Sequence, residues 1–199
     1  MTTRKKAALH NLGCKVNAYE TDAMQQLLEE NGYEIVPFTE CADVYVINTC
    51  SVTNMADRKS RQMIHRARKK NPQAIVVAAG CYVQTSTEEV IEDLAVDIVI
   101  GNNQKNHLVD CIADFESKNH PICAENAEQG TQEKNTEEKI VDCIDINQDE
   151  QEYEYFLVNK TAEHTRAFIK VQDGCNQFCS YCIIPYARGR VRSRSIEDV

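Results

Sequence analysis

The sequence predicts an α/β fold, in which helices cover both faces of an open, mostly parallel sheet. Over residues 1–115, short apolar runs of strand length alternate with longer stretches of helical periodicity. Residues 74–79 form an unbroken apolar run, as expected of a parallel strand that is covered on both faces. Turn and helix-stop residues separate these segments, so the order of elements favours repeated strand–helix units.

The first elements follow from apolar runs and the residues that interrupt them. Residues 7–12 form a short apolar strand, and residues 18–31 carry apolar side chains at helical spacing. Gly32 directly follows that helix and is a common helix stop. A second strand is expected at residues 33–36, where Pro37 ends it.

The alternation continues through the middle of the chain. Residues 44–48 are expected to be the third strand, and residues 53–70 a basic helix that ends before Pro72. The apolar run at residues 74–79 is then the fourth strand. The remaining expected elements of this domain are a helix at residues 87–94, a strand at residues 98–100 and a helix at residues 105–115.

Two further segments follow this N-terminal domain. Residues 116–160 are predicted to be an acidic linker, because most of the stretch is rich in Asp, Glu, Asn and Gln, with a short strand expected at residues 139–146. Residues 161–199 form the last segment, in which residues 165–171 alternate as a strand does. Residues 195–199 look like an N-cap and a first helical turn, which predicts that the chain is the N-terminal piece of a longer protein.

Composition favours a reducing compartment. The chain has 199 residues, a formal net charge of −9 and ten cysteines. The N-terminus lacks an apolar signal segment, and no apolar run is long enough to span a bilayer. We therefore expect a cytoplasmic protein with reduced thiols, in which metal binding is favoured over disulfide bonds. The negative charge taken alone argues against a nucleic-acid partner, but it is unevenly distributed along the chain.

Three cysteines stand close together in a Cys-x3-Cys-x2-Cys loop, at Cys175, Cys179 and Cys182. Three thiolates can hold three corners of a cubane iron–sulfur cluster and leave the fourth iron without a protein ligand, which suits a catalytic site. Structural zinc sites usually combine two pairs of ligands, and the loop lacks that pattern. The alternative interpretation is three buried or disulfide-bonded cysteines.

Three other cysteines each follow a predicted strand: Cys14 the first, Cys50 the third and Cys81 the fourth. In open α/β sheets, ligands bind beyond the carboxyl ends of the strands, where the strand order reverses. If the order is the flavodoxin-like 2-1-3-4-5, these strands are neighbours and the three thiols meet at one edge. Gly13 and Gly80 would let the backbone approach a bulky cofactor there. Alternatively, each of the three is an ordinary buried cysteine.

The loop that begins at Cys175 resembles the signature of radical S-adenosylmethionine enzymes, including the aromatic Tyr181 directly before its last cysteine. The resemblance implies a [4Fe-4S] cluster on Cys175, Cys179 and Cys182, whose open iron binds S-adenosylmethionine. It also implies that Tyr181 lies against the adenine of S-adenosylmethionine. Reductive cleavage would produce a 5′-deoxyadenosyl radical, with electrons from a donor such as flavodoxin or ferredoxin.

Further motifs resemble the methylthiotransferases. The N-terminal domain of that family is similar to Asn11-Leu-Gly-Cys14-Lys-Val-Asn17, Asn48-Thr-Cys50-Ser-Val52 and Gly80-Cys81. The segment that follows their radical loop is similar to Arg188-Gly-Arg-Val-Arg-Ser-Arg194. The resemblance covers the chain apart from the linker, and its motifs are specific together rather than singly.

The resemblance to methylthiotransferases implies two [4Fe-4S] clusters and S-adenosylmethionine as cofactors. Cys14, Cys50 and Cys81 would hold the second cluster, whose open iron would carry the sulfur to be inserted. One S-adenosylmethionine would methylate that sulfur, and another would yield the radical that takes hydrogen from carbon 2 of an adenine. The fold it implies is an open flavodoxin-like domain at residues 1–115, followed at residues 161–199 by the beginning of a truncated radical S-adenosylmethionine (β/α) barrel.

The residues around Cys14 decide between branches of the family. Gly13-Cys14-Lys15-Val16-Asn17 is similar to the branch that acts on N6-threonylcarbamoyladenosine, next to the anticodon of tRNA on its 3′ side. The alternatives are the isopentenyladenosine tRNA branch, the branch that modifies a ribosomal protein, a non-catalytic iron–sulfur module and a structural metal-binding domain. Because later parts of the family's pattern are absent, we expect the 199-residue chain to bind clusters without catalytic turnover on its own.

Two basic segments are candidates for contact with the anticodon loop of tRNA. The helix at residues 53–70 is strongly basic, although a solvated surface would explain this charge equally well. The alternating arginines Arg188, Arg190, Arg192 and Arg194 could meet successive phosphates, contact S-adenosylmethionine or pair with the acidic linker.

Overall fold

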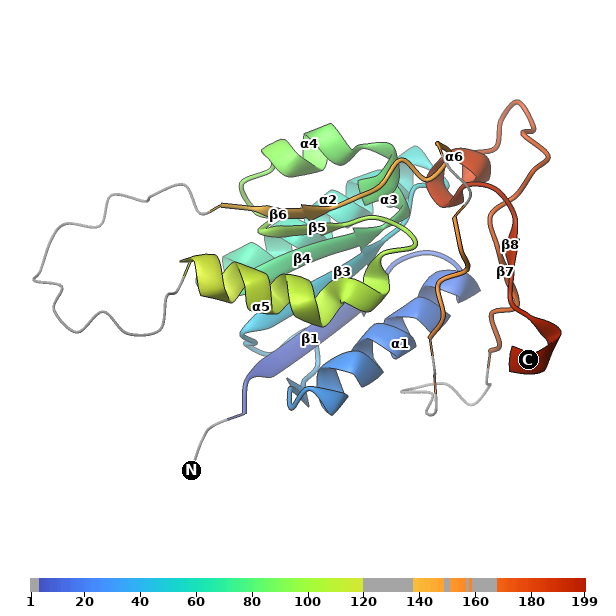
Figure 1. Cartoon of the computed structure of the whole chain (residues 1–199). Helices are drawn as coiled ribbons and strands as arrows, with labels where there is room; N and C mark the ends of the chain where they lie inside the picture. Colours follow the sequence, from blue (N-terminus) through green and yellow to red (C-terminus); the bar gives the residue numbers. More distant parts are fainter. Residues whose placement is uncertain (1–3, 120–137, 149–150, 157, 159–167) are drawn as a thin grey trace, which may run out of the picture.

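The computed structural model describes residues 4–119, 138–148, 151–156, 158 and 168–199. Its centre is a six-stranded parallel sheet in the order β2-β1-β3-β4-β5-β6 (Figure 1). The strands are β1 (Lys6–Asn11), β2 (Glu34–Ile35), β3 (Val44–Thr49), β4 (Ile75–Gly80), β5 (Ile98–Ile100) and β6 (Ile140–Asp142). Strands β3 and β4 are buried along their whole length, as their unbroken apolar sequences predict.

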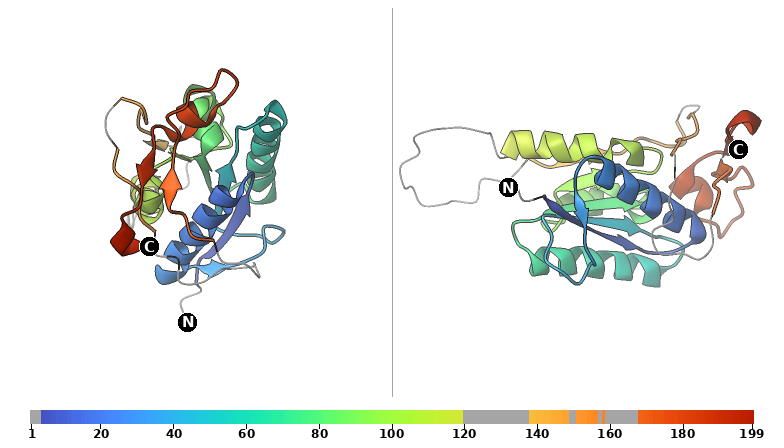
Figure 2. Two further views of the ribbon diagram at one scale, coloured as in Figure 1. Left: turned by 90° about the vertical axis from the view of Figure 1, so that its right-hand side faces the viewer. Right: turned by 90° about the horizontal axis from the view of Figure 1, so that it is seen from below.

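Helices cover both faces of this sheet (Figure 2). On one face lie α1 (Lys15–Glu30) and α5 (Leu108–Asn119), the latter preceded by the 3-10 turn η1 (Lys105–His107). On the other face lie α2 (Asn54–Lys70), α3 (Cys81–Thr85) and α4 (Thr87–Glu92). Each face has its own apolar core, because successive residues of β3 and β4 point to opposite sides of the sheet.

This arrangement confirms the predicted flavodoxin-like α/β fold and its strand order. The short strand expected near residues 139–146 is observed as β6, which pairs with β5 at the edge of the sheet. Helix α1 begins at Lys15, three residues before its predicted start, and the five-residue helix α3 was not predicted. Residues 120–137 of the predicted acidic linker lie outside the described residues, and the domain boundaries remain a prediction.

The carboxyl-terminal segment differs from its prediction. Among its described residues, β7 (Gln172–Asp173) and β8 (Arg192–Ser193) make a separate antiparallel pair, with α6 (Ile184–Arg188) between them and the 3-10 turn η2 (Ile196–Asp198) after them, and the predicted beginning of a barrel remains a prediction. The prediction of a strand at residues 165–171 is wrong for residues 168–171, which form no regular element. Residues 165–167 lie outside the described residues. An alternating strand would bury Ile169 and expose Lys170, but Ile169 is 64% exposed and Lys170 is buried.

None of the helices in the described part of the chain combines the length and the apolar character that crossing a membrane requires.

Candidate functional site

Cys14, Cys50 and Cys81, here called the Cys14 triad, lie beyond the carboxyl ends of three neighbouring strands. Cys14 follows β1 and is the N-cap residue of α1, Cys50 directly follows β3, and Cys81 is the first residue of α3, directly after β4. The thiol-bearing residues Cys50 and Cys81 are buried, and Cys14 is exposed. Parallel strands end at one edge of a sheet, which is why residues far apart in the sequence meet here.

Glycine makes the close approach of the Cys14 and Cys50 loops feasible. Gly13 has a φ of +108°, a backbone conformation that favours glycine, and a Cβ atom there would lie 2.7 Å from Cys50 Sγ. Gly80 has a φ of +98°, and a Cβ atom there would lie 2.6 Å from Asn48 Oδ1. A side chain larger than that of glycine therefore does not fit at Gly13 or Gly80, and the backbone can pass close to the neighbouring side chains.

Asn17 holds two of the triad loops together. Its Nδ2 donates to Leu12 O at 2.7 Å and to Thr49 O at 2.9 Å, so one side chain links the segments that precede Cys14 and Cys50. Its Oδ1 accepts a hydrogen bond from Arg188 Nη2 at 2.6 Å. The amide group is thus fixed on both sides.

Asn102 does the same for the third cysteine. Its Nδ2 lies 3.5 Å from Cys81 Sγ and donates to Ala187 O at 2.6 Å. Its Oδ1 accepts from Lys105 Nζ at 2.6 Å. Since Ala187 belongs to α6, this amide connects the Cys14 triad directly to the segment that follows the second cysteine loop.

A buried ion network, here called the Glu20 network, joins the sheet domain to the carboxyl-terminal segment. Glu20 binds Lys105 and Lys170 through its two oxygens, each at 2.7 Å, and Arg188 Nη1 at 2.8 Å. Asp173 completes the network, because it pairs with Lys170 at 2.7 Å and with Arg188 at 3.0 Å. All five side chains are buried, so these charges depend on one another.

The network shifts the protonation equilibria of its members. Burial alone would raise the pKa of Glu20, but Arg188, Lys105 and Lys170 outweigh it and hold the pKa well below its ordinary value of 4.5. Burial raises the pKa of the Cys50 thiol, and the neighbouring Cys81 and Cys14 raise it further, whereas Arg188 lowers it. Arg188 is therefore close enough to the triad to act on it electrostatically.

The second cysteine group, here called the Cys175 loop (residues 175–182), folds against the arginine-rich segment. Cys175 N donates to Gly189 O at 3.0 Å, and Arg190 lies 4.2 Å from the centre of the Phe178 ring. Gly174, at a φ of +76°, lies so close to Arg190 that a Cβ atom would be 2.0 Å from its carbonyl oxygen. Cys175 and Cys182 are partly buried and Cys179 is exposed.

The donor sets fit iron–sulfur clusters in their chemistry. Each set supplies three thiols, which are the ligands that such clusters take, and at least one thiol of each set is exposed to solvent. Within the described residues, no three His, Cys, Asp or Glu side chains are grouped so as to hold a metal ion as they stand. The thiols would therefore need to adjust their positions around a bound cluster.

The structure separates the four arginines that were predicted to contact RNA. Arg188 is 4% exposed and Arg192 is 7% exposed, with the former inside the Glu20 network and the latter 4.0 Å from Asp173. Contact of these two with phosphates is inconsistent with this structure, because it would require buried charges to leave their partners. Arg190 is exposed and Arg194 is partly exposed, and for both the prediction stays open. Tyr181 is 92% exposed, and its contact with adenine also remains a prediction.

Sequence analysis missed the polar residues that support the cysteines: Asn17, Glu20, Asn102, Lys105, Lys170 and Asp173. One signal was available, because Glu20 lies four residues before Met24 and eight before Leu28. It therefore shares the buried face of α1 with them, where an unpaired carboxylate would be costly. The identity of its partners depends on residues about 85 to 168 positions away, which spacing does not reveal.

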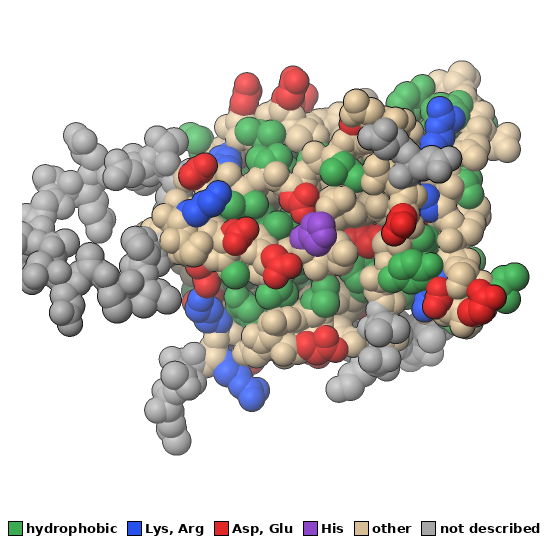
Figure 3. All heavy atoms as spheres, viewed as in Figure 1, with side chains coloured by type: hydrophobic (Ala, Val, Ile, Leu, Met, Phe, Trp, Pro, Cys, Tyr) green, Lys and Arg blue, Asp and Glu red, His purple; other side chains and the backbone are tan. Residues whose placement is uncertain are grey.

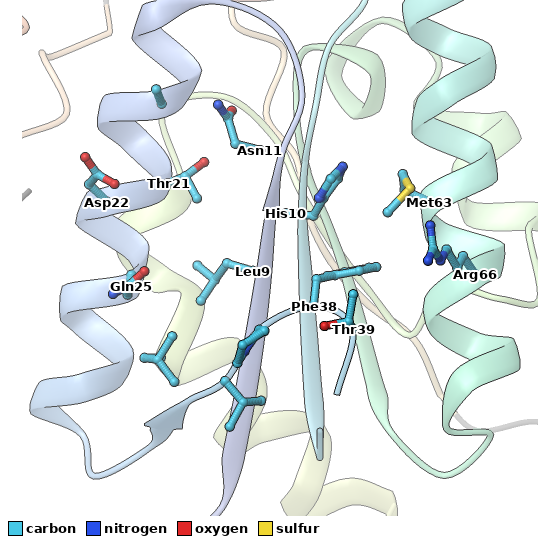
Figure 4. A pocket seen from close by; sticks show the side chains of 14 residues that line it. Leu9, His10, Asn11, Thr21, Asp22, Gln25, Phe38, Thr39, Met63 and Arg66 are labelled. Atoms are coloured by element: carbon cyan, nitrogen blue, oxygen red, sulfur yellow. The ribbon is translucent and has the colours of Figure 1, made fainter. Parts of the chain in front are cut away.

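One cavity lies away from the cysteines, along the free edge of β1. Its volume is about 620 Å³, and Figure 4 shows Leu9 and Asn11 on the α1 side of the strand and His10 near Phe38, Met63 and Arg66. It arises because β2 pairs only with Lys6 and Ala7, which leaves the rest of β1 without a neighbour on that side. Burial is the main cause of the lowered pKa of His10, followed by the charge of Arg66.

Comparison with known proteins gives a consistent result. Residues 6–101 match the model of Uncharacterized protein family UPF0004. Threonylcarbamoyladenosine tRNA methylthiotransferase MtaB of Bacillus subtilis (strain 168) is 43% identical over 96% of this chain and 38% of its own length. The protein of the same name from Aquifex aeolicus (strain VF5) is 40% identical over 98% of this chain and 43% of its own length. Ribosomal protein uS12 methylthiotransferase RimO of Acetivibrio thermocellus is 32% identical over 98% of this chain and 41% of its own length.

The chain therefore spans about two fifths of the length of the curated relatives it matches. The matched region spans the positions of both cysteine groups, since it covers nearly the whole chain.

Replacing Glu20 with Gln should destabilise the protein by about 3–5 kcal/mol, because three buried cations would lose their shared carboxylate. The pKa of Glu20 is lowered by folding, so its contribution is fully present above the ordinary value of 4.5 and is lost as pH falls through the folded-state pKa. Urea unfolding from about pH 6 down to about pH 2 should therefore show a weaker acid dependence in the variant, because the loss of stability falls between the ordinary pKa of 4.5 and the lower folded-state pKa.

Glu30→Gln is the matched control, since Glu30 is exposed on the same helix. An equal loss of stability in both variants would contradict the central role of Glu20.

Replacing Gly13 with Ala should destabilise the protein and disturb Cys50, because the new Cβ atom would overlap its Sγ. Gly32→Ala is the control: Gly32 also has a positive φ of +86°, but no atom lies within 4 Å of its Cβ position. Both variants carry backbone strain of about 1–3 kcal/mol. Thermal unfolding should show a clearly larger loss for Gly13→Ala, and equal losses would mean that the contact with Cys50 is unimportant.

Proposed function

We propose that this chain is part of a radical S-adenosylmethionine methylthiotransferase that acts on tRNA, because residues 6–101 match the model of family UPF0004 and nearly the whole chain is similar to named methylthiotransferases. The observation that carries the proposal is the placement of three cysteines at the carboxyl ends of the neighbouring strands β1, β3 and β4, with Arg188 close enough to act on Cys50. Cysteines with a purely structural role could lie anywhere in the fold, whereas these three lie at the edge where open α/β sheets usually bind ligands.

In this proposal the Cys14 triad holds one [4Fe-4S] cluster and Cys175, Cys179 and Cys182 hold another. Three protein ligands per cluster leave one iron open, which supplies sulfur transfer at one site and S-adenosylmethionine binding at the other. The chain's own residues have three tasks. Asn17 fixes the loops of Cys14 and Cys50, Asn102 fixes Cys81, and Arg188 supplies positive charge beside thiolates.

The proposed substrate is N6-threonylcarbamoyladenosine, next to the anticodon of tRNA on its 3′ side. Support comes from two relatives named for that nucleoside, which are 43% and 40% identical, whereas two others of the same name and the relative named for a ribosomal protein are each 32% identical. We further propose a cytoplasmic location, an electron donor such as flavodoxin or ferredoxin, and contact of Tyr181 with the adenine of S-adenosylmethionine.

Iron and acid-labile sulfide per chain, measured after anaerobic reconstitution, test the cluster assignment. Wild type should bind about eight irons, and replacing either Cys14, Cys50 and Cys81 or Cys175, Cys179 and Cys182 with Ala should leave about four. Cys41→Ala with Cys143→Ala is the control and should leave iron content unchanged. Zinc or disulfides in place of iron would contradict the proposal.

Nucleoside mass spectrometry of tRNA tests the substrate. A strain that lacks the full-length gene should lose the methylthio form of N6-threonylcarbamoyladenosine, and the full-length gene should restore it, whereas the 199-residue chain alone should not. Loss of the methylthio form of isopentenyladenosine instead would assign the protein to the other tRNA branch. Intact methylthio nucleosides would favour a non-catalytic iron–sulfur protein.

A further inference from the structure

Helix α2 concentrates positive charge in an acidic protein. The chain has 22 Lys and Arg residues against 31 Asp and Glu residues, yet α2 alone carries seven of the former and one of the latter. By contrast, Figure 3 shows Asp and Glu side chains spread over the opposite side of the molecule, around α5. The charge of α2 is therefore a local feature rather than a consequence of composition.

Two of the seven basic residues of α2 have structural partners. Arg61 donates to the hydroxyl of Tyr82 at 3.1 Å and lies over its ring, and Arg68 pairs with Asp97 at 2.5 Å. These two residues fasten the helix to the sheet domain. Because these contacts within the protein stabilise the position of the helix, the charges of Arg61 and Arg68 need no external partner to explain them.

The remaining basic residues form the α2 basic face: Arg58, Lys59, Arg66 and Lys69, all exposed, with the partly buried Lys70 at its end. Within the described part of the chain none of the five takes part in an ion pair (the pairs observed there involve other residues). Arg66 even has like charges three and four residues later, at Lys69 and Lys70, which is unfavourable on a helix. Lys69 and Lys70 lie in the last turn, where positive charge is favourable, but that position does not explain Arg58, Lys59 and Arg66 near the start and middle of the helix. A helix face with five cations outside any described ion pair is suited to an external anionic partner.

The position of α2 relates this face to the Cys14 triad. The helix begins at Asn54, four residues after Cys50, and runs away from the triad for 17 residues, a length of about 25 Å. Figure 2 shows it on the outside of the sheet, with no described element over its outer surface. A ligand that lies along α2 would therefore extend toward the cysteine edge.

We propose that the α2 basic face binds the phosphate backbone of RNA and directs it toward the Cys14 triad. The inference rests on the proposed function, since it takes the RNA to be the tRNA substrate. It is a backbone contact that positions the RNA, without reading its bases.

The α2 basic face suits RNA better than an acidic protein. Protein interfaces are usually centred on apolar and aromatic side chains, with charges at the rim. The outer surface of α2 offers one large apolar side chain, Met55, at the first turn. Cations repeated along the helix instead match the regular charges of a phosphate backbone.

The test is the affinity of the chain for a fluorescein-labelled RNA hairpin with the sequence of an anticodon arm, measured by fluorescence anisotropy at several salt concentrations. The variant Arg58→Ala/Arg66→Ala/Lys69→Ala should bind about tenfold or more weakly near 0.1 M salt. Its log–log salt slope should be smaller by about two to three, because three phosphate contacts are lost. Alanine is a strong helix former, so α2 should stay intact, which circular dichroism checks.

The matched control is Arg4→Ala/Lys5→Ala/Lys118→Ala, which removes the same charge from exposed residues near the start of β1 and in the last turn of α5. It should bind RNA nearly as wild type does. Equal weakening of both triple variants, or no weakening of the α2 variant, would overturn the proposal. Displacement of the RNA by polyglutamate at equal charge concentration would do so too, because it would indicate a surface for acidic proteins.

The two proposals can fail separately. Iron loading of wild type tests the proposed function without RNA, whereas RNA affinity tests the α2 basic face without a cluster. Loss of RNA binding in an α2 variant that loads iron normally would support the RNA contact specifically. A wild-type chain that loads iron but binds no RNA hairpin would overturn it.

Discussion

The carboxylate of Glu20 is the interaction on which the candidate site depends. It lies buried on α1 and meets cations from three separate places in the chain, Lys105, Lys170 and Arg188. The sheet has its own apolar cores and needs no such device. The segment at residues 168–199 contributes few buried apolar side chains, so polar contacts must fix it. Breaking a buried pair of this kind costs more than forming it contributes, which makes the geometry specific.

The network also explains how two cysteine groups can share one framework. Arg188 follows the Cys175 loop by six residues, yet its guanidinium bonds to Asn17, which holds the loops of Cys14 and Cys50. Asn102 adds a second connection between Cys81 and α6. Movement of one cysteine group therefore strains the supports of the other, although no side chain of the two groups needs to touch.

The sheet could be predicted from sequence because each parallel strand is a short apolar run followed by a recognisable break. Where local pattern conflicts with tertiary contact, prediction failed. Residues 165–171 alternate as a strand should, but Glu20 and Asp173 draw Lys170 inward and leave Ile169 exposed. The triad was predictable because strand ends converge, whereas its amide and charged supports come from distant residues that no spacing rule identifies.

The Glu20 network also places charge beside the Cys14 triad. It contains three cations, Lys105, Lys170 and Arg188, but two carboxylates, Glu20 and Asp173. Buried Glu154 and Arg192 add one further charge of each sign beside these five, and among the cations Arg188 acts electrostatically on both Cys81 and Cys50. Arg188 therefore offsets part of the cost of placing negative charge on Cys50, whereas burial and the two neighbouring thiols act against that charge.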